Sequence, residues 1–173
     1  MDQREYLVHF VRHMLDGVAQ SIEDLSVEQL HARPHEHSNS IGFDAWHVFR
    51  TADNIVHFAF ERAQPIWLQQ GLDERWGLPR LAQGTGMEPQ EAYALRFPDP
   101  AALAQYGRDV RDAILPRIEA MDDDYLQTVT RVVPYGEITR LEAIGQTLIA
   151  HGNNHLGRID LARALLGKSG LGF

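Results

Sequence analysis

The feature that most constrains the fold is a long helical pattern near the C-terminus with two histidines on its apolar side. Between Thr139 and Gly167, apolar residues recur at helical spacing and fall within a narrow arc of the helix surface. His151 and His155, from the run HGNNH, fall inside the same arc. Thr139 and Glu142 form a capping box that predicts the start of this helix, which runs to about residue 166. The apolar residues of the arc are Leu141, Ile144, Leu148, Ile159, Ala162 and Leu166.

Two histidines on a face that packs into a core need polar partners, because burying an unpaired polar group costs roughly 2–7 kcal/mol. A spacing of four residues stacks both imidazoles on one side of a helix. They are then either two ligands of one metal or core histidines bonded to polar groups, and we favour the metal. HGNNH is not HExxH, so the general base of a zincin peptidase is absent and a metallopeptidase is disfavoured.

Three further segments have the apolar periodicity of long helices. Asn39 or Ser40 is the predicted cap of the second helix, and Asp99 followed by Pro100 is the predicted cap of the third. Together with the last helix they predict an all-α protein, a four-helix bundle. The three segments span residues 2–25, about 40–63 and about 99–118.

The stretches between these helices predict a long ordered connection and a short hairpin. From about Pro65 to Pro98 the chain is rich in Gly and Pro with scattered aromatic residues, which argues against one continuous regular element. From Gln127 to Val133, β-branched residues alternate weakly, and a turn at residues 134–136 follows. The connection therefore lies between helices two and three, and the hairpin lies before helix four.

The second helix is apolar over most of its surface, so we expect neighbours on several sides or a role in a dimer. Only Arg50, Asp53, His57 and Glu61 form a polar stripe, which predicts a solvent-facing edge and a surface position for His57. His47 lies on a flank beside the main apolar face and can look toward a neighbouring helix. Periodicity alone leaves a structural histidine and a metal ligand equally open for it.

The remaining histidines are expected at the surface. His9 and His13 lie well off the apolar arc of the first helix. His31, His35 and His37 lie in or beside a polar loop, where exposure or a tag-like affinity for metal is the simplest interpretation.

The composition restricts the chemistry further. The 173 residues suit one domain, residues 1–173. The chain has no cysteine, so a metal must rest on nitrogen and oxygen ligands and any thiol must come from a cosubstrate. A net charge of −8 disfavours binding to nucleic acid. The apolar runs are too short for a membrane span and there is no signal-peptide core, so we expect no membrane association and a cytoplasmic location.

The chain resembles the DinB/YfiT-like superfamily of metalloenzymes. The resemblance rests on NSIGFDAWHVFRTADNI around His47, on HGNNHLGRI around His151 and His155, and on the order of the helices over nearly the whole chain. It implies a four-helix bundle in which one histidine of the second helix and two of the last helix bind a divalent metal ion. These ligand positions match His47, His151 and His155.

The chain departs from the family pattern HxxxHRGQ, because Leu156 and Arg158 stand at the arginine and glutamine positions. By helical geometry, Arg158 lies on the same stripe as the two histidines of the last helix. Four alternatives are open for its guanidinium. It repels a metal ion, binds an anionic substrate, pairs with a carboxylate behind a metal ligand, or extends to the surface.

Relatives in the superfamily include transferases that use bacillithiol or mycothiol and a mycothiol-dependent maleylpyruvate isomerase. The resemblance therefore implies a metal-dependent enzyme, either a low-molecular-weight-thiol S-transferase or a hydrolase, with zinc or nickel as the ion. A small-molecule substrate and a homodimer are further expectations. Asp44, Asn54 and Asn154 are candidate polar residues near the site.

A second hypothesis is a stress-response or interaction protein whose metal is structural or vestigial. A structural ion would be closed by a fourth protein ligand, for which the loop offers His35 or His37. Trp46, Trp67 and Trp76 would then mark a dimer or partner surface.

Overall fold

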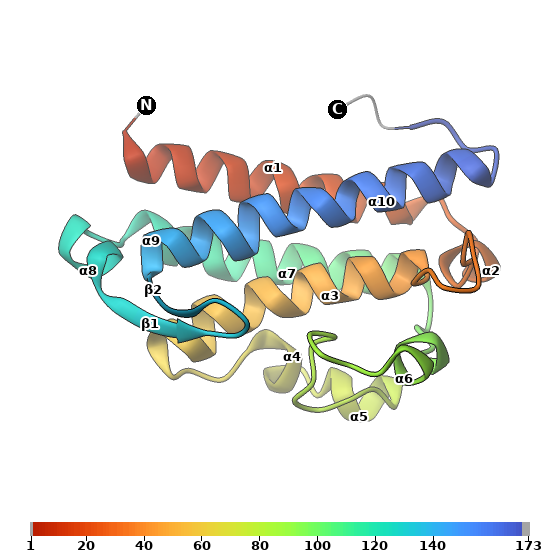
Figure 1. Cartoon of the computed structure of the whole chain (residues 1–173), viewed down its shortest axis with the longest axis horizontal. Helices are drawn as coiled ribbons and strands as arrows, with labels where there is room; N and C mark the ends of the chain where they lie inside the picture. Colours follow the sequence, from red (N-terminus) through yellow and green to blue (C-terminus); the bar gives the residue numbers. More distant parts are fainter. Residues whose placement is uncertain (1, 171–173) are drawn as a thin grey trace.

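Long helical rods that lie side by side dominate the computed structural model, which describes residues 2–170 (Figure 1). The predicted four-helix bundle is confirmed. The rods are α1 (Gln3–Glu23), α3 (Ile41–Asp53) with its continuation η1 (Asn54–Phe60), α7 (Pro100–Glu119), and α9 (Arg140–Ala143) with η2 (Ile144–Ala150) and α10 (His151–Leu165).

Side chains at the predicted positions cap these rods. The Ser40 hydroxyl accepts the backbone N–H of Phe43 at the start of α3, and the Asp99 carboxylate accepts that of Ala102 at the start of α7. The capping box at Thr139 opens the last rod. Each cap satisfies a backbone N–H that has no partner within its helix, which fixes where the helix begins.

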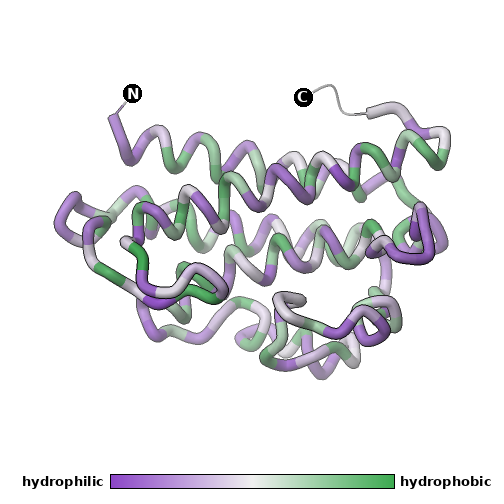
Figure 2. The backbone as a smooth tube through the Cα atoms, in the orientation of Figure 1, coloured by the Kyte–Doolittle hydropathy of each residue, from purple (hydrophilic) through white to green (hydrophobic). Residues whose placement is uncertain are grey.

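The long helices pack in two pairs around one core. α1 packs against α7 and α10, and α3 packs against the same two helices. Figure 2 shows hydrophobic and hydrophilic residues alternating in short bands along each long helix, as expected when one face of each helix is buried. α3 is the central helix, because all 13 of its residues are buried.

The segments between the long helices have short elements of their own. α2 (Val27–Leu30) follows α1, and the connection after η1 holds α4 (Ile66–Gln69), α5 (Leu72–Trp76) and α6 (Pro89–Ala94). After α7 come α8 (Asp123–Gln127) and the strands β1 (Val129–Val132) and β2 (Gly136–Thr139). The strands pair antiparallel, with Val129 opposite Thr139. The predicted connection and hairpin are both confirmed.

The predicted solvent-facing stripe of the second helix is wrong. Arg50, Asp53 and His57 are at most 1% exposed, and only Glu61 lies at the surface. The first residues of α4 and the side chain of Tyr106 from α7 cover Asp53 and supply it with hydrogen-bond donors. The polar stripe of this helix is therefore a buried polar cluster and not a solvent-facing edge.

Of the three tryptophans expected at a partner surface, Trp46 and Trp67 are fully buried, and Trp76 is half-buried against the core. The apolar excess of α3 is likewise covered by the same chain. Neither feature now supports the expected homodimer, which stays a prediction.

Two stretches of π-helix interrupt the long rods, and the apolar periodicity did not predict them. η1 follows Asp53 at the end of α3, and η2 ends immediately before His151. π-turns widen a helix locally and leave carbonyl groups free of their usual partners, and they are frequent at functional sites.

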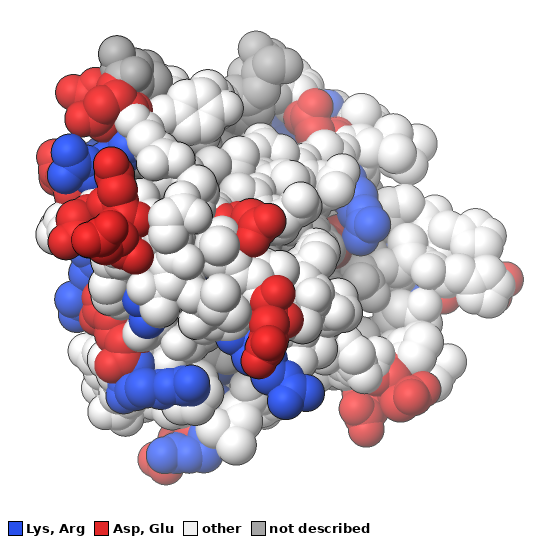
Figure 3. All heavy atoms as spheres, turned by 60° about the vertical axis from the view of Figure 1, so that its left-hand side comes forward, with Lys and Arg blue, Asp and Glu red and all other residues white. Residues whose placement is uncertain are grey.

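The charged surface is mixed. On the face shown in Figure 3, Lys and Arg side chains lie among Asp and Glu side chains rather than in one broad basic area. Among residues 2–170, no helix combines the length and the apolar character that crossing a membrane requires.

Candidate metal centre

Three histidines from two helices meet in the middle of the bundle. His47 comes from α3, and His151 and His155 lie one turn apart at the start of α10. The Nε2 atom of His151 lies 3.0 Å from Nε2 of His47 and 3.1 Å from Nε2 of His155. His47 and His155 are buried and His151 is half-buried. The structure thus brings together the three residues that the sequence singled out.

The outer nitrogen of each ring contacts an oxygen that can only accept a hydrogen bond. Nδ1 of His47 donates to the backbone oxygen of Gln83, and Nδ1 of His151 donates to that of Thr147 at 3.2 Å. Nδ1 of His155 donates to Asp44 Oδ1 at 2.9 Å. Because a carbonyl or carboxylate oxygen carries no hydrogen to donate, each Nδ1 must hold the ring hydrogen. The Nε2 lone pairs of the neutral rings therefore converge on one point.

Asp44 orients His155 from the neighbouring helix. It lies in the first turn of α3, three residues before His47, and its side chain is buried. A carboxylate behind a histidine fixes the tautomer of the ring and makes its other nitrogen a better electron donor. The sequence suggested Asp44 as a polar residue near the site, and the structure gives it this contact.

His151 is oriented by a carbonyl of its own helix, and the π-turn makes this contact available. The backbone N–H of His151 donates to the carbonyl of Gln146, five residues back, rather than to that of Thr147, four residues back. The Thr147 carbonyl instead accepts the imidazole N–H of His151. The π-turn thus helps to direct Nε2 of His151 toward the other two histidines.

The loop between α5 and α6 holds His47. Besides the hydrogen bond from His47 to the Gln83 carbonyl, the Gln83 side chain accepts a bond of 2.8 Å from Asn54 Nδ2. Gly84, with φ +102°, lies so close that an added Cβ would stand 2.8 Å from His47 Nδ1. No sequence pattern predicts these loop residues. Gln83 acts through its backbone carbonyl, and Gly84 acts by having no side chain.

The arrangement fits a cation at its centre. Nitrogen ligands of one tetrahedral zinc ion are about 3.3 Å apart, given Zn–N distances of about 2.0–2.1 Å. The Nε2 atom of His151 lies at similar distances from those of His47 and His155, and the ligand atoms of all three residues lie within 4.8 Å of one another. Protons on the rings are poor substitutes for this cation, because burial lowers the pKa of His47 to about 3. Burial, followed by the charge of His155, also lowers the pKa of His151. A divalent ion would satisfy all three lone pairs at once.

Substitution of Gly84 by alanine is expected to weaken metal binding at least tenfold, because the new methyl group displaces the His47 ring or the loop. Gly86 is a matched control: it also has a positive φ, +71°, but nothing lies within 4 Å of an added Cβ. Gly86→Ala should cost about 1 kcal/mol of stability through backbone strain and leave metal affinity unchanged. Titration of both metal-free variants with zinc tests this, and equal affinities would contradict it.

The other histidines lie outside the cluster. His9 and His13 are exposed, as predicted, and so are His35 and His37. His31 is half-buried: it donates to the carbonyl of Val27 and accepts the backbone N–H of Phe97, so it joins α2 to the segment before α7.

His57 is buried beside Asp53, which corrects its predicted surface position. Asn154 is exposed and takes no part in the histidine contacts, whereas Asn54 acts through Gln83. Among residues 2–170, His47, His151 and His155 are the one group of three or more such side chains with metal-binding spacing, and no fourth protein ligand joins them.

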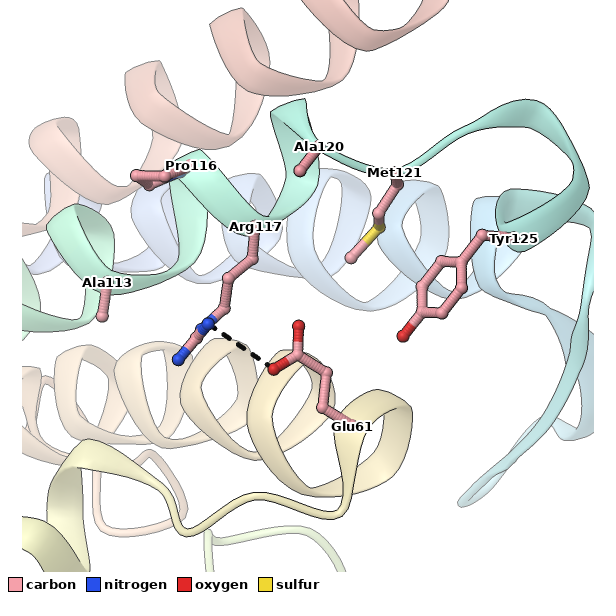
Figure 4. A pocket seen from close by; sticks show the side chains of 7 residues that line it. All are labelled: Glu61, Ala113, Pro116, Arg117, Ala120, Met121 and Tyr125. Atoms are coloured by element: carbon pink, nitrogen blue, oxygen red, sulfur yellow. Dashed lines mark ion pairs between the residues drawn. The ribbon is translucent and has the colours of Figure 1, made fainter.

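Two of the pockets formed by residues 2–170 lie toward opposite ends of the bundle. One, of about 390 Å³, has Asp44 and Arg158 in its wall, so it begins one side chain away from His155. The other, of about 530 Å³, lies between the end of η1, the end of α7 and α8 (Figure 4). In the second pocket Glu61 and Arg117 pair with each other at 3.6 Å, so its charges are already neutralised.

Comparison with known proteins agrees with this architecture. The model of the DinB superfamily matches residues 8–159. The crystal structure of a conserved protein from Enterococcus faecalis is 18% identical, with a TM-score of 0.84, over 97% of this chain and 99% of that one. YfiT from Bacillus subtilis, described as a probable metal-dependent hydrolase with an unusual four-helix bundle topology, is 11% identical, with a TM-score of 0.66, over 98% of this chain and 91% of that one. No curated protein matches the sequence significantly.

Proposed function

This chain belongs to the DinB superfamily, and we propose that it is a metal-dependent enzyme whose divalent ion is held by His47, His151 and His155. The observation that supports this most strongly is the convergence of three Nε2 lone pairs, each fixed by an oxygen on the far side of its ring. Hydrogen-bonded core histidines would not need this pattern, because their lone pairs would face donors instead of one another.

The role of the protein is to hold three neutral rings around one point. The Gln83 and Thr147 carbonyls and the Asp44 carboxylate fix the ring hydrogens on the outside. When bound, a divalent ion supplies a Lewis acid that keeps its full charge and lowers the pKa of a coordinated thiol or water. Zinc and nickel both suit imidazole ligands, and we propose one of them.

An open position on the ion distinguishes a catalytic from a structural role. The loop histidines considered as closing ligands, His35 and His37, are exposed and stand apart from the cluster in the described part of the chain. With three protein ligands and one half-buried ring, His151, the site favours catalysis over a structural or vestigial metal.

A low-molecular-weight thiol is the nucleophile that we propose first. A hydrolase commonly uses an acid or base beside the ion, but the one carboxylate that contacts the three histidines within residues 2–170, that of Asp44, already accepts from His155. Transfer of a thiol needs less from the surroundings, because a thiol has a lower pKa than water. The chain has no cysteine, so the thiol would be a cosubstrate. Hydrolysis is the second candidate, favoured by the description of YfiT.

The first test is metal content. Untagged protein purified without added metal, and then a sample stripped with chelator and reloaded, should each carry about one divalent ion per chain by plasma mass spectrometry. A double variant, His35→Ala with His37→Ala, should keep the ion and so exclude adventitious binding by the loop. Absence of metal from both wild-type samples would overturn the proposal.

Activity assays then separate the two reactions. The loaded protein should accelerate the coupling of N-acetylcysteine to an activated aryl halide more than it accelerates cleavage of nitrophenyl esters. The reverse order would make hydrolysis the better assignment.

A further inference from the structure

The pocket that begins at Asp44, one side chain away from His155, carries chemistry that metal binding does not use. Its wall is formed by the loop before α3, by the first turn of α3 and by the middle of α10. Its volume of about 390 Å³ is within the usual range for a small-molecule site. The residues that matter here are His37, Asn39, Ile41, Asp44, Arg158 and Leu161.

Arg158 is the cation of this pocket. It lies three residues after His155 on α10, so it continues the stripe of His151 and His155. A long side chain on a helix points toward the helix N-terminus, which on α10 is the direction of the two histidines.

Arg158 is exposed, so it extends to the surface at the edge of this pocket, and no ion pair or hydrogen bond joins it to an acidic residue within residues 2–170. Two other arginines of the bundle are paired with acids: Arg163 binds Asp24, and Arg117 binds Glu61 in the pocket at the other end. An unpaired guanidinium in the wall of a pocket leaves its donor fork free for a planar anion.

Asp44 limits what this anion is. Its carboxylate lines the same pocket, so the pocket contains one negative and one unpaired positive group. A phosphate dianion would be repelled by Asp44 and would need more than one cation, whereas a monocarboxylate matches the single guanidinium. Ile41 and Leu161 add apolar surface beside the charged end. The pocket therefore fits a small organic acid with an apolar portion.

We propose that Arg158 binds a carboxylate group of the substrate or cosubstrate and so positions a small organic acid against the metal centre. This inference rests on the proposed function for its reaction, but the binding of a carboxylate by Arg158 is testable separately.

The first experiment uses two thiols that differ only at the far end, 3-mercaptopropionate and 3-mercaptopropanamide. Protein reloaded with Co²⁺ is titrated with each, and binding is followed by the sulfur-to-cobalt absorption band. Wild type should bind the acid about ten- to a hundredfold more tightly than the amide, as expected for a charge-assisted bond. Arg158→Gln should reduce this preference to less than about twofold and leave the affinity for the amide unchanged.

Two variants control for charge. Arg158→Lys should retain part of the preference. Arg131→Gln removes the same charge from the exposed face of the hairpin and should retain all of it. If the wild type does not distinguish acid from amide, or if Arg158→Gln keeps the preference, the inference is wrong.

A second measurement does not depend on metal. In metal-free protein labelled with ¹⁵N, butyrate should shift the Nε–H resonance of Arg158, while butyramide should not. Failure to take up Co²⁺ would overturn the proposed metal site, but this titration would still decide whether Arg158 binds carboxylates. The absence of a butyrate shift, together with equal affinities for the two thiols, would leave the metal site standing and remove the carboxylate anchor.

Discussion

Replacement of His151 by alanine is expected to abolish stoichiometric metal binding and yet leave the metal-free protein at least as stable as the wild type. His151 stands between the other two rings, with its Nε2 3.0 Å from that of His47 and 3.1 Å from that of His155. Without a cation, these lone pairs repel one another, so removal of the middle ring relieves an unfavourable contact. Its truncation costs little packing, because the side chain is only half-buried.

Thermal unfolding with and without zinc measures both effects. Zinc at a hundred times its Kd should raise the Tm of the wild type by about 5–10 °C, which corresponds to about 2.7 kcal/mol in a protein of this size. The His151→Ala variant should show no such shift. The control is His9→Ala, which removes an exposed histidine of α1 and should behave as the wild type does.

The same experiment tests the competing interpretation. If the three histidines were a hydrogen-bonded cluster of the core, His151→Ala would lower the Tm of the metal-free protein by several degrees, and zinc would not change the Tm of the wild type. That outcome would favour the non-catalytic hypothesis.

The sequence predicts those parts of the molecule that depend on local patterns. The long helices follow from apolar periodicity, and their starts follow from side chains such as Ser40, Asp99 and Thr139 that bond backbone groups three residues away. The pair His151 and His155 is visible because both residues lie on one helix. His47 needed the family resemblance, since periodicity alone left it open between a ligand and a structural histidine.

The groups that orient the histidines could not be predicted. Gln83 accepts a hydrogen bond from His47 through its backbone carbonyl, and Thr147 accepts one from His151 through a carbonyl released by a π-turn. Gly84 leaves room for the His47 ring because it has no Cβ. None of these leaves a residue-type signal at a recognisable spacing. Asp44 could be suggested, because it is a carboxylate in the first turn of α3, but its contact with His155 spans 111 positions of the sequence.

The burial of the polar stripe of the second helix could not be predicted for a related reason. Helical periodicity shows which residues share a face but not what covers that face. Asp53 and His57 are buried because α4 and α7 pack over them, and those elements lie 13 and 53 residues further along the chain from Asp53. The prediction placed solvent against this stripe, whereas in the structure hydrogen-bond donors from α4 and α7 lie against it.

This buried cluster carries the second large prediction: Asp53→Ala should destabilise the protein by about 3–5 kcal/mol. Asp53 Oδ1 accepts from the backbone of Ile66 at 2.9 Å and from Nδ1 of His57 at 2.8 Å. Its Oδ2 accepts from the backbone of Trp67 at 2.9 Å and from the hydroxyl of Tyr106 at 2.8 Å. Alanine would leave the Trp67 and Tyr106 donors and the part-buried Ile66 N–H without this acceptor, and His57 Nδ1 would keep only the backbone carbonyl of residue 53 at 3.2 Å.

Arg50 increases this cost. Its guanidinium is 1% exposed and lies 3.9 Å from Asp53 Oδ2, and its Nη1 has no other polar partner in the described residues. Loss of the carboxylate would leave a buried cation without its counter-charge, which is the costly way to break a buried pair. The hydroxyl of Tyr106 depends on the same environment, since burial, followed by the charge of Asp53, raises its pKa well above the usual value.

Chemical denaturation of the metal-free proteins measures this loss, with Asp73→Ala as the matched control. Asp73 is also buried, but its ion-pair partner Arg80 is 61% exposed and returns to water when the pair is broken. The control should therefore lose at most about 1 kcal/mol. If Asp53→Ala does not fold, Tyr106→Phe, which removes one donor, should still fold and lose about 1 kcal/mol.

The outcome bears on the metal centre as well as on stability. Asp53 ties the end of α3 to the first residues of α4, where the connection that carries Gln83 and Gly84 begins. A variant that loosens this connection should also lower zinc affinity, because Gln83 orients His47. Equal losses of stability in Asp53→Ala and Asp73→Ala would show instead that the cluster is no stronger than a single exposed ion pair, and that the connection is held by its apolar contacts alone.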